Sequence, residues 1–410
     1  MSEATSHRPW LALQAMLAVQ VLASLVMSTA AVLAPAVAPA AGLAPERVGL
    51  FVAVAYLCAM TSGLRTGHWV ARIGGVRVSQ CALLALASGA LMATLGHAWA
   101  MLLGAVLVGV GYGLANPSAA AVLGRHVPSN ASGLFFSMKQ AGVPIGVALT
   151  GLLMPLGLYL AGWRITVAAA AVLCVAVALL LMPAVRRLDA DHVPHDARLP
   201  WLAPLREVWA SPHLRHLGWL SLVYAMAQQA FVTFLVSLLH LQGGLPLAAA
   251  AGILSASQVA STFSQVGLGH LSDRRITPLR LLGWLGLAMG VSLCALAAAG
   301  ALTTPGSAMQ WMLGLLAALA AGATAMGWNG VFFAALVRRV PRERLAVVSG
   351  ATQFFTFGGG MLGPLLLGEF VRAGTGHALA YAAFAVVPAA AAMALARQNA
   401  RNAVAAPTHR

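Results

Sequence analysis

NPSAAAVLGRHVP, at residues 116–128, returns later in the chain as NGVFFAALVRRVP, at residues 329–341. The positions that the two copies share are Asn116 and Asn329, Arg125 and Arg338, Val127 and Val340, and Pro128 and Pro341. A second repeat follows directly, in which Ser132, Gly133, Gly142, Gly146 and Gly151 recur as Ser349, Gly350, Gly359, Gly363 and Gly368. Such self-similarity indicates that one structural unit is used twice. The sequence therefore predicts two parallel halves.

Both copies border long apolar runs. Nothing charged occurs at 10–45, 78–124 or 140–163, and about 20 apolar residues suffice to cross a bilayer. The composition agrees, with 60% hydrophobic and 8% charged residues and a mean hydropathy of +0.85. A soluble protein would need a polar surface that 9 acidic and 24 basic residues cannot supply. We predict a multi-pass, all-α membrane protein.

Breaks at charges and at Gly/Pro clusters place twelve transmembrane helices along the chain. The expected ranges are 10–38, 47–70, 78–98, 100–123, 133–160, 163–184, 216–241, 247–271, 279–300, 307–336, 346–371 and 376–397. A polar linker, 185–215, divides them into six-helix bundles at 1–184 and 216–410. Parallel six-helix halves are typical of transporters that hold their substrate between the halves.

The arginines set the expected orientation. With both termini in the cytoplasm, only Arg47, Arg164 and Arg372 fall on the opposite side, as the positive-inside rule requires. The net charge of +15 then reflects this bias and not a nucleic-acid surface, because the arginines are scattered over several short segments. We expect a multi-pass protein of the inner (cytoplasmic) membrane.

The loop between the second and third helices carries a family motif. In the major facilitator superfamily this loop reads Gly-x-x-x-Asp-Arg, followed by Gly and basic residues, and GHWVARIGGVR here resembles it. The matching residues are Gly67, Arg72, Gly74 and Arg77, with Ala71 in place of the aspartate. The second half keeps Gly269, Asp273 and Arg274 in GHLSDRR, and GWR at 162–164 is also similar to the family. The resemblance covers essentially the whole chain and implies a twelve-helix transporter.

The resemblance also implies a gate. In this family the loop aspartate and arginine bind helix ends and help to hold one face of the transporter closed. We expect Asp273 and Arg274 to do so here, with Gly67, Arg72 and Gly269 at the same motif; the alternative is a solvated loop pair. The family's exporters often carry Gly-Pro late in the fifth helix. Val147 replaces that proline after Gly146, which argues against a drug exporter.

Lys139 is the only lysine among the 24 basic residues, and it lies inside the helix predicted at 133–160. A cation there costs about 3 kcal/mol to insert and is a functional candidate. Gly146 and Thr150 share its helix face, and these small residues suggest a protein interior. The alternative is that the lysine snorkels back to the interface. Because lysine can lose its proton when desolvated, unlike arginine, Lys139 could hold an anion, carry a coupling proton, or do both.

Other polar groups predict a hydrogen-bonding pocket around this lysine. Pro144 cannot donate a helical hydrogen bond, so the carbonyl group of Gln140 needs another partner. The expected pocket residues are Asn116, Lys139, Gln140, Gln228, Gln229, Gln258, Asn329 and Gln353, with Tyr56, Tyr112, Trp328 and Phe354 as walls. Each could equally serve as a contact between helices.

No acidic residue falls in the middle of a predicted helix, although Glu369 approaches the end of one. A proton-driven exporter of cationic drugs is therefore disfavoured, because it would bury a carboxylate. We predict a monomeric secondary transporter that moves a small anionic solute, such as an organic carboxylate, by alternating access. The alternative is an exporter of amphiphilic or neutral compounds in which Lys139 is structural.

Other partners and other chemistry are not expected. The four cysteines and the histidines show no spacing typical of a disulfide framework, a metal site or a cofactor site, so an enzyme is not expected either. The partners that we expect are the small-molecule solute, the lipid bilayer and, as an option, a coupling proton. Substrate identity, direction of transport and coupling ion stay open.

Overall fold

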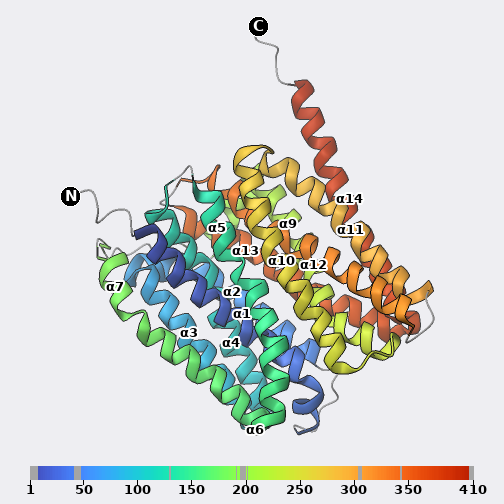
Figure 1. Ribbon diagram of the computed structural model, residues 1–410. Helices are drawn as coiled ribbons and strands as arrows, with labels where there is room; N and C mark the ends of the chain where they lie inside the picture. Colours follow the sequence, from blue (N-terminus) through green and yellow to red (C-terminus); the bar gives the residue numbers. More distant parts are fainter. Residues whose placement is uncertain are drawn as a thin grey trace.

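The computed structural model describes residues 8–40, 48–128, 131–190, 192–193, 200, 202–302, 307–341 and 344–405. Long helices make up nearly all of this part of the chain (Figure 1). The first half contains α1 (Arg8–Ala40), α2 (Val48–Ile73), α3 (Gly75–Ala93), α4 (Ala98–His126), α5 (Ser132–Gln140) and α6 (Gly142–Leu180). The second half contains α9 (Pro212–Ser237), α10 (Leu247–Arg274), α11 (Pro278–Leu302), α12 (Ala308–Val337), α13 (Leu345–Phe370) and α14 (Gly376–Ala405). Short π-helical turns follow α9 at Leu238–Gln242 and α13 at Val371–Thr375.

The fifth and sixth predicted helices are joined without a loop. α6 continues through Gly162, whose φ of 80° and ψ of 163° are not helical, and only glycine adopts such angles readily. The chain turns back there, so that α5 and the first part of α6 form one crossing and the rest of α6 forms the next. The break between α5 and α6 at Ala141 lies three residues before Pro144, as expected of a proline that cannot continue the hydrogen-bond ladder.

Twelve membrane crossings follow from these helices, as the sequence predicted. Within the described residues, nine spans are long and apolar enough to cross a membrane by length and composition. One of them, Leu134–Leu180, holds both crossings that turn at Gly162. The other two crossings are α10, which is rich in Ser, Thr and Gln, and α14, which contains the shorter apolar segment Ala378–Met393.

The two halves pack by the same rule. In each half the first helix packs against the fifth crossing: α1 against α6, and α9 against α13. Repeat-related glycines allow this contact, because a β-carbon at Gly146 would overlap the carbonyl oxygen of Val21, and one at Gly363 would overlap that of Met226. The halves then meet side by side where α2 contacts α13 and where α10 contacts α5 and α6.

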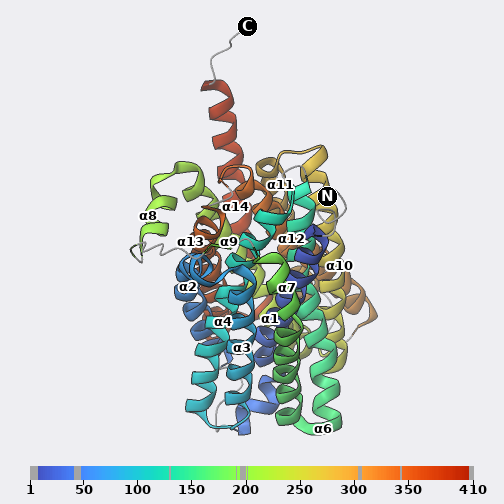
Figure 2. The ribbon, with the colours of Figure 1, turned by 90° about the vertical axis from the view of Figure 1, so that its left-hand side faces the viewer.

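One end of the bundle is rich in arginine. This arginine-rich end is where α2, α4, α10 and α12 end, and Arg72, Arg125, Arg274 and Arg338 lie in or directly after their last turns. α1 begins and α14 ends toward the same side of the molecule (Figures 1 and 2). The cytoplasmic placement of this end stays a prediction; labelling of Ala190→Cys by an impermeant reagent from outside intact cells would contradict it.

The halves are closed against each other toward the arginine-rich end. Phe136 of α5 stacks on Phe333 of α12 with ring centroids 5.9 Å apart. On the other side of the bundle a β-carbon at Gly67 of α2 would come within 2.9 Å of Val347 on α13. Because these contacts join different halves, they must separate when this end opens.

Two short helices occur around the predicted linker: α7 (Met182–Leu188), which begins three residues before it, and α8 (Ala203–Ala210), which lies within it. α8 lies beside α9 and α13 (Figure 2). Residues 191, 194–199 and 201 of the linker lie outside the described residues, and the boundaries at 184 and 216 stay predictions. α7 ends beside the end of α4, where His126 Nε2 lies 2.9 Å from the carbonyl oxygen of Leu188.

Candidate functional site

Lys139 lies in the interior of the first half. Its side chain is 2% exposed, and its Nζ donates to Gln20 Oε1 at 2.5 Å, to Gln140 Oε1 at 2.8 Å and to Asn116 Oδ1. These three acceptors come from α1, α5 and α4. The ammonium group is therefore held by neutral amide oxygens, and it does not snorkel in this structure.

The helix face that carries Lys139 packs on α1. Gly142 allows close approach, since a β-carbon there would come within 3.0 Å of Gln20. Thr150 Oγ1 donates to the carbonyl oxygen of Leu25 at 3.1 Å. The small residues on this face thus bring α1 close enough for Gln20 to reach Lys139. This face was expected from the sequence to lie in the protein interior.

Asn116 connects the lysine to the second half. While its Oδ1 accepts from Lys139, its Nδ2 donates to Gln353 Oε1 on α13 at 3.3 Å. All three side chains are buried. A change at Lys139 can therefore reach the contact between the two halves through one intervening side chain.

A second polar cluster lies on the repeat-related helices of the other half. Gln228 Oε1 on α9 accepts from Asn329 Nδ2 at 3.0 Å and from Trp328 Nε1 at 2.9 Å. Here an amide of the first helix meets the repeat asparagine directly. In the first half Gln20 and Asn116 both accept from Lys139 instead. The second half therefore makes the contact between the first-helix glutamine and the repeat asparagine without a cation, and the first half adds Lys139 between them.

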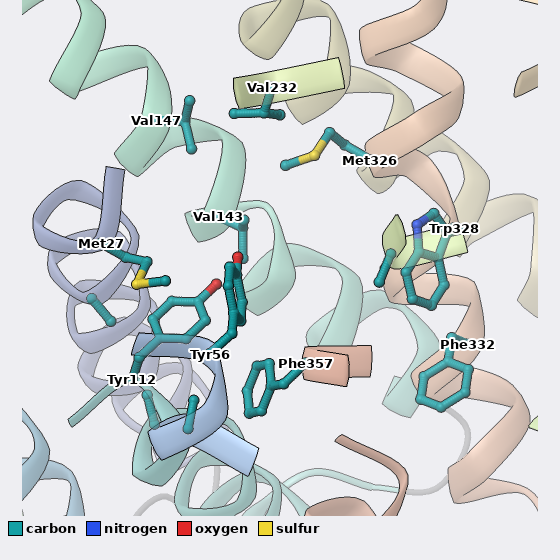
Figure 3. Packing of buried hydrophobic residues seen from close by; sticks show 14 of the residues in the cluster. Met27, Tyr56, Tyr112, Val143, Val147, Val232, Met326, Trp328, Phe332 and Phe357 are labelled. Atoms are coloured by element: carbon teal, nitrogen blue, oxygen red, sulfur yellow. The ribbon is translucent and has the colours of Figure 1, made fainter. Parts of the chain in front are cut away.

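Aromatic side chains line the region between the two clusters. Tyr56 and Tyr112 meet edge to face at 6.0 Å, and Phe357 of α13 lies 5.6 Å from Tyr112. Figure 3 shows these rings on one side of the central region and Trp328 on the other. The hydroxyl group of Tyr56 donates to Gln229 Oε1 at 2.9 Å, again from one half to the other.

The predicted pocket residues therefore meet in two clusters joined by cross-half hydrogen bonds. The exceptions are Phe354, which is only half-buried and contacts Phe355 at 6.0 Å, and Gln258, which hydrogen-bonds only its neighbour Ser257 at 3.2 Å among the described residues. Gln20 was missed by the sequence reasoning. A glutamine in the middle of the apolar run 10–45 was the available signal.

The gating residues lie at the arginine-rich end, but their roles stay predictions. Arg72 lies in the last turn of α2 and Arg274 is exposed, while the side chain of Asp273 lies outside the part of the chain that the structure describes. Wild-type transport by Asp273→Asn would contradict its gating role. Gly269 is buried, and its carbonyl oxygen accepts from Ser272 at 2.8 Å.

An aspartate from another segment reaches the motif loop that lacks its own. Asp189 Oδ2, just beyond α7, accepts from the backbone N–H groups of Val76 at 2.9 Å and Arg77 at 3.3 Å. These N–H groups belong to the first turn of α3, where a carboxylate is favoured by unpaired donors and by the helix dipole. Asp189 thus supplies a carboxylate next to the loop in which Ala71 replaces the family's aspartate.

Two six-helix halves with a polar centre between them define a membrane transporter. The family model of the Major Facilitator Superfamily matches residues 16–364. The chain belongs to this superfamily, and it is a multi-pass secondary transporter of small molecules and not an enzyme.

Three known proteins are similar to this chain. The 3-(3-hydroxy-phenyl)propionate transporter of Escherichia coli (strain K12) is 27% identical over 366 residues, covering 87% of this chain and 86% of that protein. The solved proton:xylose symporter XylE has a TM-score of 0.68 at 16% identity and 96% coverage of both chains. The E. coli fucose:proton symporter FucP has a TM-score of 0.69 at 16% identity, covering 94% of this chain and 97% of that one. At this identity the two symporters show the fold alone.

Proposed function

We propose that the protein transports a small aromatic carboxylate, with Lys139 as the counter-charge for the carboxylate group. The observation that carries this proposal is the buried ammonium group, which within the described part of the chain is held only by neutral amides. The ion pairs among the described residues join Arg344 to Glu207 and Arg372 to Glu369, far along the chain from this lysine. Lys139 thus keeps an uncompensated charge in a low-dielectric setting, where an anion is strongly attracted.

The difference between the two halves supports a functional role for this charge. Gln228 and Asn329 show that the first helix and the repeat asparagine can meet without a cation. Packing alone therefore does not require Lys139. A buried cation that packing does not require, and that costs free energy to insert, is retained where it binds something.

The aromatic rings support the rest of the substrate class. Tyr56, Tyr112 and Phe357 form an apolar wall with polar edges, to which an aryl ring can pack edge to face. The curated relative carries a name that combines a hydroxylated phenyl ring with a propionate group. Lys139 supplies the charge, and the wall supplies the surface, that such a solute needs.

Binding to the purified protein tests the proposal. A ligand that binds only the folded state raises the midpoint of thermal unfolding, so 3-(3-hydroxyphenyl)propionate should raise it and xylose and fucose should not. Lys139→Ala should abolish the shift, because among the described residues Lys139 is the only charged side chain that is buried. Asn329→Ala provides the matched control, since it alters the uncharged cluster and should keep part of the shift. Stabilisation by the sugars alone, or an unchanged shift in Lys139→Ala, would contradict the proposal.

Proton-coupled symport into the cell is part of this proposal. The symporters of like fold are named as proton-coupled, and a lysine can carry the proton because it can lose its own. The direction is tested in proteoliposomes by imposing a pH gradient and following accumulation of the labelled acid. Equal accumulation with and without the gradient would contradict proton coupling.

A further inference from the structure

α10 is the most polar of the long helices at the centre of the bundle. Its hydroxyl groups are used to bind α12: Ser261 Oγ donates to the carbonyl oxygen of Gly322 at 2.6 Å, and Ser264 Oγ donates to that of Ala323 at 2.8 Å. These contacts account for one face of the helix. They do not account for its two glutamines.

Gln258 and Gln265 carry unpaired amide groups. Gln265 is 0% exposed, and neither its Oε1 nor its Nε2 has a partner among the residues that the structure describes. Gln258 is equally buried and its Oε1 is unpaired as well. A buried amide without a partner costs free energy, and in a membrane no lipid can satisfy it. Two such residues on one helix therefore indicate that these amide groups find partners in another conformation of the transporter.

Both glutamines face the contact between the halves. Seven residues turn a helix by about 700°, so the two side chains lie within about 20° of each other. Ser255 lies about 60° from Gln258 around the helix axis, and its Oγ donates to the carbonyl oxygen of Ala148 on α6 at 3.4 Å. Ser261 lies about 60° from Gln258 in the opposite direction and contacts α12. The face between them points to α5, which packs against both α10 and α12.

α5 presents a third unpaired group at this contact. Ser137 Oγ is buried and has no partner within the described part of the chain. It lies against Gly330 of α12, where a β-carbon would overlap it. Counting along the antiparallel helices from the Ser255–Ala148 contact places Gln265 opposite Met138, next to Ser137 and at the level of Lys139.

We propose that Gln265 and Ser137 form a second binding station for the carboxylate, used when the arginine-rich end opens. We call these two residues the release station. It rests on the proposed function, because its ligand is the same anion. Separation of Phe136 from Phe333 would move α5 away from α10 and α12 and expose both groups. The Ser137 hydroxyl and the Gln265 amide are neutral donors, which hold a carboxylate less tightly than an ammonium does, so the anion can leave Lys139 and then leave the protein.

Exposure of the station can be measured without knowing the substrate. In a background that lacks the native cysteines, Gln265→Cys should react with an impermeant thiol reagent applied from the arginine-rich side of inside-out vesicles. Ser261→Cys is the matched control, because it lies one turn away and faces α12, and it should stay unreactive. Equal reactivity at the two positions, or none at position 265, would overturn the proposal.

Binding at the station is tested by Gln265→Leu, which keeps the size and removes the amide. We expect unchanged affinity for 3-(3-hydroxyphenyl)propionate in the closed conformation, and exchange in proteoliposomes slowed about threefold or more, because release loses its second partner. The unfolding midpoint should rise, since an unpaired amide is gone. Wild-type exchange by Gln265→Leu would overturn the station. Normal binding by Lys139→Ala would instead overturn the proposed function, and the labelling result would still decide whether the station opens.

Discussion

Asn116 donates a hydrogen bond of 3.3 Å to Gln353, from α4 of the first half to α13 of the second. The same asparagine accepts from Lys139, so the charge at the centre of the first half and the contact between the halves share one side chain. Alternating access requires the halves to move relative to each other around the bound solute. Binding of the solute at Lys139 can therefore change the contact between the halves through Asn116.

Asn116→Ala should weaken both binding and the fold. A hydrogen bond to a charged group contributes about 1.5–3 kcal/mol, and Lys139 would lose one of its three acceptors. Gln353→Leu should cost less, because it breaks only a neutral hydrogen bond. Thermal unfolding of the two variants and of the double variant gives their coupling energy. Strict additivity would show that the two side chains do not interact.

Lys139→Arg separates charge from proton transfer. Arginine keeps the positive charge but cannot release its proton under ordinary conditions. If Lys139 carries the coupling proton, the variant should exchange labelled substrate across proteoliposomes and fail to accumulate it against a gradient. Retention of both activities would limit Lys139 to the role of counter-charge. Because the guanidinium group is bulkier beside Gly142, binding must be measured alongside transport.

Asp189→Ala should destabilise the start of α3. The carboxylate accepts from the N–H groups of Val76 and Arg77, and such capping contributes about 1 kcal/mol. Asp189→Asn keeps an acceptor and loses the charge, so it should cost less. Gly74→Ala should also destabilise, because its φ of 92° and ψ of 157° are costly for other residues by about 1–3 kcal/mol. Urea unfolding of the detergent-solubilised variants checks these effects, and wild-type stability of Asp189→Ala would contradict the capping role.

Gly146→Ala and Gly363→Ala should each loosen the packing of the first helix on the fifth crossing of its half. The added methyl group meets a backbone carbonyl oxygen of Val21 or Met226, and overpacking of this kind costs about 1–3 kcal/mol. Gly252→Ala is the control, because nothing lies within 4 Å of its β-carbon position, and alanine favours the helix by up to about 1 kcal/mol. Similar unfolding midpoints for all three variants would contradict this account.

The sequence by itself determined the architecture. The twelve crossings and the two parallel halves were predicted and are confirmed by the helices and the family. The physical reason is that lipid leaves the chain few choices: apolar runs of sufficient length must be helices, and a repeated sequence must pack in a repeated way. The same constraint singled out Lys139, because a cation among apolar residues is visible without any coordinates.

Only the tertiary structure decided which polar groups meet. Nothing in the sequence says that Gln20 rather than Gln14 reaches Lys139, that Asp189 crosses from α7 to the motif loop, or that the side chain of Gln265 finds no partner among the residues that the structure describes. Each of these depends on the rotation of a helix about its axis and on the distance at which glycines let two helices approach. Those quantities are set jointly by residues far apart in the chain, so they appear only when all the helices are packed.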